Sequence, residues 1–143
     1  MTEQKIKNKD CIFCKIIKGE IPCYKIYENE EILAYLDIFP VNIGHTLIIP
    51  KNHHQNIFEI PESTLLKITK QSKIIATNIK KKLNYDGVNI LQSNGKSAGQ
   101  VIHHYHMHII PRYENDKMEL HFNSNKNPIT QEQGNKMLTK LLN

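Results

Sequence analysis

Three histidines alternate with apolar residues in the segment His104–His108. Successive side chains of an extended chain point to opposite faces, so His104, His106 and His108 would share one face at a spacing of about 6.6 Å. Clustered imidazoles disfavour one another, because each protonation makes the next one harder. The pattern therefore indicates chemistry rather than a chance stretch of solvated strand.

Neutral imidazole is a nucleophile at pH 7, and it leaves readily from a phosphoryl group. We therefore expect His106, the middle member, to attack phosphorus. Its neighbours His104 and His108 can hold its tautomer, bind phosphoryl oxygens or transfer protons. The polar, glycine-bearing loop Ser93–Gln100 comes just before these histidines, and its backbone N–H groups can form an anion cradle.

Metal binding is the second chemistry that the residue types suggest. His104 and His108 are about 13 Å apart along a strand, whereas zinc–nitrogen bonds are about 2.0–2.1 Å long, so one zinc ion on all three histidines is disfavoured. Cys11 and Cys14 form a C-x-x-C pair, a spacing typical of metal or redox chemistry in an intracellular chain. The redox alternative is weak because no βαβ pattern surrounds the pair. The remaining cysteine, Cys23, is expected to be a small core residue.

The elements that must position these residues begin with a short helix. Apolar residues at helical spacing predict it, and Gly19 ends it; they are Ile12, Phe13, Ile16 and Ile17. Two β-rich runs within Cys23–Leu36 predict a hairpin. The run Gly44–Pro50 predicts a strand that proline ends, and the turn after it carries two histidines.

The most regular element is a long amphipathic helix over Leu65–Leu83, with apolar residues every three or four positions and lysines on the outer face. Strands are expected at Val88–Leu91 and Val101–Ile110, and a weak terminal helix at Gln131–Leu142. This order of elements predicts an α+β fold. We expect a largely antiparallel five-stranded sheet with one long and one short helix, besides the weak terminal one.

Length and composition limit the domain organisation. The chain has 143 residues, of which 39% are hydrophobic, enough for one packed domain. We expect a flexible N-terminus over 1–10, a single domain over 11–112 and a tail over 113–143. No run approaches the roughly 18 apolar residues of a membrane span, and the polar N-terminus does not resemble a signal peptide, so a cytoplasmic protein without membrane contact is expected.

The charge balance argues against specific nucleic-acid binding. The net charge is +5, from 19 basic and 14 acidic residues. Proteins that read nucleic acids rely on arginine for bidentate contacts, yet Arg112 is the one arginine of this sequence. We therefore attribute the basic excess to general lysine content.

Several motifs resemble those of the histidine-triad family, in its Hint-type branch. The alternating signature is His104-Tyr-His106-Met-His108-Ile-Ile, and it lies between Ala98-Gly99-Gln100 and Pro111-Arg112. The resemblance extends over 11–112 through further motifs: Cys11-Ile-Phe-Cys14-Lys-Ile-Ile, Ile21-Pro22, Leu36-Asp37-Ile38 and Gly44-His45-Thr-Leu-Ile-Ile-Pro50-Lys51. A match of this extent is far more specific than a single motif.

The resemblance implies a nucleotide hydrolase or nucleotidyl transferase that cleaves purine nucleoside phosphoramidates or related mononucleotide conjugates. By this resemblance His106 forms a nucleotidyl-histidine intermediate and His108 binds a phosphoryl oxygen. His104 and His45 support them. Asp37 takes the two ribose hydroxyls, which suits an acceptor-only group.

The resemblance also implies an apolar base pocket and a phosphate-binding loop. The pocket residues would be Ile12, Phe13, Ile16, Tyr35 and Ile38, although a plain core role is an alternative for each. The loop contacts would be Ser93, Asn94, Gln100 and Val101. Many relatives carry Asn or Gln at the position of Ser93, and several carry Ser or Thr at the position of Val101. These departures leave the substrate preference open.

The Hint-type resemblance completes the cysteine pair with His53 and His104, a Cys₂His₂ set for structural zinc, with His54 as an alternative to His53. Zinc-bound His104 would be neutral and fixed, and the charge of the ion would disfavour protonation of His106. The resemblance further implies a homodimer whose two sheets join across a shared edge.

Two rival functions use the same residues. One is hydrolysis of dinucleoside polyphosphates, the other large activity of histidine-triad proteins. The other is a nucleotide-binding regulator whose slow hydrolysis is incidental. Rates and affinities on defined nucleotides separate the three.

Overall fold

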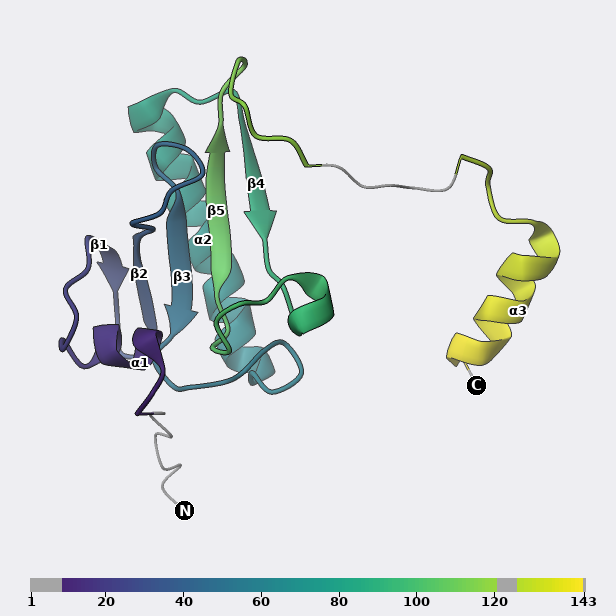
Figure 1. Ribbon diagram of the computed structural model, residues 1–143, viewed down its shortest axis with the longest axis horizontal. Helices are drawn as coiled ribbons and strands as arrows, with labels where there is room; N and C mark the ends of the chain where they lie inside the picture. Colours follow the sequence, from purple (N-terminus) through teal and green to yellow (C-terminus); the bar gives the residue numbers. More distant parts are fainter. Residues whose placement is uncertain (1–8, 121–125, 143) are drawn as a thin grey trace.

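The computed structural model describes residues 9–120 and 126–142, which contain a five-stranded antiparallel sheet (Figure 1). The strands are β1 (Lys25–Glu28), β2 (Ile32–Leu36), β3 (Thr46–Pro50), β4 (Gly87–Leu91) and β5 (Met107–Arg112). Their order across the sheet is β1-β2-β3-β5-β4, and all neighbours are antiparallel. The predicted α+β fold with a five-stranded antiparallel sheet is confirmed.

The helices are short α1 (Ile12–Ile17), long α2 (Glu62–Leu83) and terminal α3 (Gln131–Leu142), with a 3₁₀ turn η1 (Lys96–Ala98) in the glycine-bearing loop. None of the residues of α3 is buried. Among the residues described, no helix combines the length and apolarity that crossing a membrane requires. The flexible segment expected over 1–10 falls mainly on residues 1–8, outside the described residues.

The sheet separates two apolar cores, because α2 covers one face and α1 the other (Figure 1). The core under α2 contains Ile32, Ala34, Ile48, Ile60, Ile68, Ile75, Ala76, Tyr105, Met107 and Ile109. The smaller core under α1 contains Phe13, Leu33, Tyr35, Leu47 and Ile49. Alternate residues of β2 and β3 thus face different cores, and every residue of β3 is buried.

The strand that carries the histidines begins later than the sequence predicts. We predicted a strand over Val101–Ile110, but β5 starts at Met107, so this boundary was wrong. Before that point the chain leaves β3: the N–H of Tyr105 donates to the carbonyl of His54 at 2.7 Å. His104 and His106 therefore lie in irregular chain before the strand, where the ring of Phe13 from α1 packs against both.

Gly44 turns the chain into β3 immediately before His45. Its φ of +89° lies in the left-handed region that favours glycine. A Cβ atom at this position would lie 2.7 Å from Cδ1 of Leu83 and 3.2 Å from Cγ of Pro111. The turn is therefore packed against the end of α2 and against β5, and this packing positions His45, which directly precedes β3.

We expect Gly44→Ala to lower the free energy of unfolding by about 1–3 kcal/mol, because the new Cβ adds both positive-φ strain and overlap. Gly19→Ala is the matched control: φ is +80° and no atom lies within 4 Å of the added Cβ, so only strain remains, about 1 kcal/mol. Urea denaturation of both variants measures the difference. Equal losses would contradict tight packing around Gly44.

Candidate active site and metal centre

A cavity of about 490 Å³ lies on the α1 side of the sheet, within the size range of small-molecule sites. It is bounded by α1, by the end of β2 and by the chain that precedes β5. Its lining residues are Ile12, Phe13, Ile16, Ile21, Pro22, Cys23, Tyr35, Leu36, Asp37, Ile38, Phe39, Leu47, Gly99, Val101, Ile102, His106 and His108. Most of the lining is apolar, and two imidazoles and a carboxylate supply groups that can do chemistry.

A larger cavity of about 840 Å³ lies between β1 and α2, on the opposite face of the sheet. Lys67, Lys70 and Lys82 line it together with isoleucines and amides, and the lining contains no histidine, cysteine or acid. Because its lining holds no histidine and no set of metal ligands, we place the candidate site in the smaller cavity.

His106 is almost buried, and a main-chain carbonyl determines its tautomer. Nδ1 lies 2.7 Å from the carbonyl oxygen of His104, which can only accept, so Nδ1 carries the proton and Nε2 keeps its lone pair. Burial lowers the pKa of His106, against the opposing effects of the His104 carbonyl and of Asp37, so the ring is neutral at pH 7. Phe13 packs edge-on against it, with ring centroids 5.2 Å apart.

A chain of hydrogen bonds likewise determines the tautomer of His108. The N–H of Val41 donates to Nδ1 of His45 at 3.1 Å, so neutral His45 carries its proton on Nε2. That nitrogen lies 2.9 Å from Nδ1 of His108, to which it donates. The proton of neutral His108 is therefore on Nε2, and His108 brings a hydrogen-bond donor to the cavity.

Burial keeps this pair of imidazoles uncharged. Burial, followed by repulsion from His106 and His45, lowers the pKa of His108 to about 4. Burial also lowers the pKa of His45, although the carboxylate of Asp37 opposes that effect. The Oδ2 atom of Asp37 is 3.6 Å from Nε2 of His45, and its Oδ1 accepts from the N–H of Phe39 at 2.9 Å. This carboxylate is therefore fixed next to the imidazole pair.

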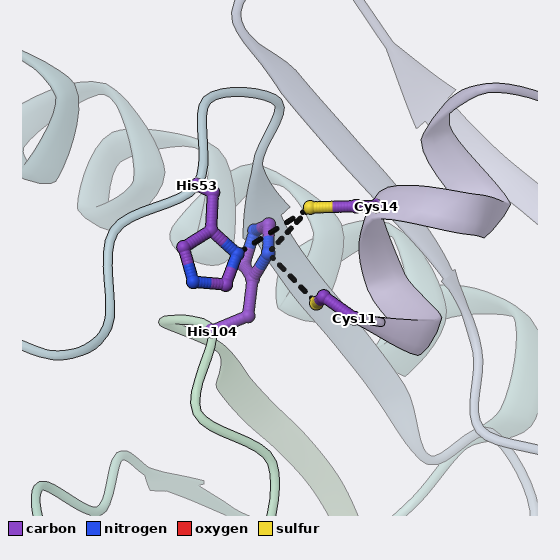
Figure 2. A group of neighbouring side chains, drawn as sticks. All are labelled: Cys11, Cys14, His53 and His104. Carbon is purple, nitrogen blue, oxygen red and sulfur yellow. Dashed lines mark hydrogen bonds between the residues drawn. The ribbon is translucent and has the colours of Figure 1, made fainter. Parts of the chain in front are cut away.

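His104 is not among the residues that line the cavity, and its ring lies next to two cysteines and a second histidine (Figure 2). Its Nε2 donates to the carbonyl of Pro50 at 2.8 Å, so Nδ1 is unprotonated and available as a ligand. Nδ1 lies 3.5 Å from Sγ of Cys11 and 3.6 Å from Sγ of Cys14. Nδ1 of His53 lies 3.4 Å from Sγ of Cys14.

These four side chains fit a tetrahedral metal ion. Their ligand atoms all lie within 4.8 Å of one another. Zinc–sulfur bonds of about 2.3 Å and zinc–nitrogen bonds of about 2.0–2.1 Å imply a sulfur–nitrogen separation of roughly 3.5 Å in a tetrahedral site. The three measured separations agree with this value. Burial lowers the pKa of His104 to about 4, which keeps the imidazole in the neutral form that a ligand requires.

Some predicted site residues lie outside this arrangement. Ser93, Asn94 and Gln100 do not line the cavity. The amide of Asn94 accepts from the N–H of Ile57 at 2.7 Å, and buried Gln100 bonds the main chain of its own loop and of Gln55. Asn94 and Gln100 thus brace the loop, and their predicted contact with a nucleotide stays a prediction. His54 is not part of the four-residue cluster, which contains His53.

Other groups of the candidate site could not be predicted from the sequence. The carbonyls of His104 and Pro50 and the N–H of Val41 decide which nitrogen of each histidine carries its proton. Main-chain groups of this kind leave no mark on a sequence. Cavity-lining Phe39, by contrast, is 85% exposed, and an aromatic residue directly after the motif containing Asp37 was a signal that could have been noted.

Curated relatives match most of this chain. An uncharacterized HIT-like protein of Methanocaldococcus jannaschii is 50% identical over 117 residues, which are 82% of this chain and 90% of that protein. An adenylylsulfatase of Arabidopsis thaliana is 46% identical over 80% of this chain and 58% of the plant protein. Adenosine 5'-monophosphoramidase of Candida albicans is 42% identical over 71% of this chain and 70% of that enzyme.

Solved structures share the whole architecture. A HIT family protein from Bacillus anthracis superposes with a TM-score of 0.87 at 44% identity, over 94% of this chain and 96% of that chain. A zinc-bound histidine triad family protein from Mycobacterium smegmatis superposes with a TM-score of 0.74 at 34% identity, over 92% of this chain and 95% of that chain.

The sequence model of the HIT domain matches residues 18–115, from the end of α1 to just beyond β5. This span includes the three alternating histidines, His45 and Asp37, whereas Cys11 and Cys14 precede it. With half of the 117 aligned residues identical to the archaeal relative and the same fold in the bacterial structures, this chain belongs to the HIT domain family.

Proposed function

We propose that this protein is a nucleotide hydrolase that cleaves purine nucleoside phosphoramidates, or related mononucleotide conjugates, through a nucleotidyl-histidine intermediate. The 2.7 Å contact between Nδ1 of His106 and the carbonyl of His104, from which the tautomer follows, is the observation that carries the proposal. Nδ1 of His106 is engaged by the His104 carbonyl, and in the described part of the chain no hydrogen bond is recorded for Nε2. A neutral imidazole with a free lone pair, in the wall of a cavity, is what attack on phosphorus requires.

The reaction balances in two steps. Nε2 of His106 bonds to the α-phosphorus while the phosphorus–nitrogen bond of the substrate breaks, and the departing amine takes one proton from solvent. Water then attacks phosphorus, the bond to His106 breaks, and one proton returns to solvent. The products are a nucleoside monophosphate and an amine. The Nε2–H of His108 stabilises the negative charge that develops on the phosphoryl oxygens in both steps.

The cavity offers a place for each remaining part of a nucleotide. The fixed carboxylate of Asp37 can accept hydrogen bonds from the ribose hydroxyls. The apolar walls, which include Phe13, Ile16 and Ile102, suit a flat base. The fungal relative is named a monophosphoramidase and the plant relative an adenylylsulfatase. Both names support adenylyl conjugates as the substrate class.

We expect His106→Ala and His106→Gly to reduce turnover of an adenosine phosphoramidate by at least about a thousandfold, because the nucleophile is lost. The thermal unfolding midpoint should change little. His103→Ala, which removes an exposed histidine from the same segment, is the matched control and should keep wild-type turnover. A fluorogenic phosphoramidate assay measures the rates, and turnover by the His106 variants at the wild-type rate would exclude the proposed nucleophile.

Side-by-side substrates test the reaction class. Given a phosphoramidate, adenosine 5'-phosphosulfate and a diadenosine polyphosphate at equal concentration, the protein should have its highest kcat/KM on one of the first two. Mass spectrometry of the quenched reaction should find adenylate attached to His106. Faster loss of the diadenosine polyphosphate would establish the rival hydrolase instead. Micromolar binding of adenosine monophosphate with negligible turnover of all three would support the nucleotide-binding regulator.

We further propose that Cys11, Cys14, His53 and His104 hold zinc. The observed separations of their ligand atoms support this, as does the zinc-bound relative from Mycobacterium smegmatis. When bound, zinc would supply a structural cross-link between the beginning of α1, the chain after β3 and the chain before β5. The carbonyl of His104 contacts Nδ1 of His106. A metal ion that held the ring of His104 in place would therefore also help to hold the proposed nucleophile in place.

Removing the metal should lower the thermal unfolding midpoint, by ~2–4 °C for each kcal/mol of stability lost. We expect a chelator to produce this shift and added zinc to reverse it. Cys14→Ser should reduce the zinc content well below one ion per chain. Cys23→Ser is the control, because Cys23 lies outside the cluster. An unfolding midpoint that chelation leaves unchanged, with no zinc in the purified protein, would refute the assignment.

The homodimer, the cytoplasmic location and the domain boundaries at 11–112 stay predictions. They follow from composition and from the family resemblance. Sedimentation of the full chain tests the homodimer, and limited proteolysis tests the domain boundaries.

A further inference from the structure

One buried hydroxyl stands out. In the described part of the chain, the hydroxyl of Tyr35 is the buried side-chain polar atom for which no hydrogen-bond partner is found. The side chain is 4% exposed. A buried hydroxyl without a partner destabilises a fold, and native structures pair nearly all such groups. A group of this kind in a ligand cavity points to a partner that the ligand supplies.

Tyr35 lies in the wall of the same cavity as the candidate nucleophile. It belongs to the face of β2 that packs under α1, and Phe13 contacts its ring edge-on with centroids 6.1 Å apart. The ring of Phe13 also packs against His106, so Phe13 lies between the tyrosine and the reacting end. Asp37 follows two residues later, about 6.6 Å along an extended chain. Tyr35 therefore lies next to Asp37, the residue proposed to bind the ribose, on the side where the base would be.

The surroundings of Tyr35 offer a base little else to bind. Leu33, Leu47 and Ile49 share its core, and apolar side chains contact the faces of a base without distinguishing one polar edge from another. Cys23 contributes only a weakly hydrogen-bonding sulfur. Burial, followed by the nearby Cys23 and Asp37, raises the pKa of the Tyr35 hydroxyl. The group therefore stays protonated and can both donate and accept a hydrogen bond.

From this placement we infer that the Tyr35 hydroxyl hydrogen-bonds a polar edge atom of the nucleobase and makes the cavity selective among bases. The inference rests on the proposed function, because it assumes that a nucleotide occupies the cavity. It identifies Tyr35 as a specificity-determining residue. Its ligand class is the purine mononucleotide of the proposed function, whose base carries ring nitrogens and exocyclic groups that can pair with the hydroxyl of Tyr35.

The protein contains a matched comparison. Tyr85 is also buried, at 3% exposure, but its hydroxyl donates to the carbonyl of Ala76 within the α2 region. Tyr35→Phe removes an unpaired hydroxyl from the cavity, whereas Tyr85→Phe removes a paired one that is not in the cavity lining. If the Tyr35 hydroxyl recognises the base, Tyr35→Phe should weaken nucleotide binding without lowering stability. Tyr85→Phe, which removes a hydroxyl with a structural role, should lower stability without weakening nucleotide binding.

The test is calorimetric binding of adenosine, guanosine, cytidine and uridine monophosphates to the wild type, Tyr35→Phe and Tyr85→Phe. Tyr35→Phe should weaken binding of the preferred purine nucleotide by about five- to tenfold and narrow the differences among the four bases. Ribose 5-phosphate, which has no base, should bind the wild type and Tyr35→Phe equally. Tyr85→Phe should bind all ligands as the wild type does.

Thermal unfolding supplies the second measurement. Tyr35→Phe should unfold at or above the wild-type temperature, and Tyr85→Phe below it. Equal affinities of Tyr35→Phe and the wild type for all four nucleotides, or an equal loss for ribose 5-phosphate, would overturn the inference. Failure of the wild type to bind any nucleotide would overturn it together with the nucleotide site. Base-selective binding without turnover would reject the hydrolase and leave the role of Tyr35 standing.

Discussion

The chemistry proposed for this protein depends on the position of one proton on each of three neutral imidazoles. A histidine can act as a nucleophile or a metal ligand only through an unprotonated nitrogen, and as a hydrogen-bond donor only through a protonated one. Here main-chain groups determine which nitrogen carries the proton. The carbonyl of His104 leaves Nε2 of His106 free, the carbonyl of Pro50 leaves Nδ1 of His104 free, and the N–H of Val41 acts on His108 through His45. Because these partners belong to the backbone, the fold itself determines which nitrogen of each histidine carries the proton.

The late start of β5 makes this assignment possible. A strand that continued back to residue 101 would place its carbonyls in the sheet ladder, where they bond neighbouring strands. Instead the chain bends away from β3 before Met107, so the His104 carbonyl is available to His106. The same bend turns the side chain of His104 toward Cys11 and Cys14. One residue thus contacts the proposed nucleophile through its backbone and the proposed zinc cluster through its ring.

Element types could be predicted from the sequence because the hydrophobic periodicities are strong. The run from Leu65 to Leu83 predicts α2, and Gly19 marks the end of α1. The beginning of β5 could not be predicted, because alternation at His104–His108 is typical of a strand, and only the tertiary contacts of His104 and Tyr105 with Pro50 and His54 interrupt it. Spacing alone also cannot show that Gln100 is occupied by its own loop, or that the hydroxyl of Tyr35 is unpaired.

The two cores lie on opposite sides of the sheet, so the residues of one can be changed with little effect on the packing of the other. Along β3, Ile48 packs under α2 while Leu47 and Ile49 pack under α1, and β2 alternates in the same way with Ala34 and Tyr35. Neighbouring residues of β2 and β3 therefore belong to different cores. Substitutions at positions facing α2 would change mainly the stability of the protein. Substitutions at positions that face α1 and line the cavity would also change the specificity for the proposed ligand. Variants of the two kinds could be selected separately and then combined.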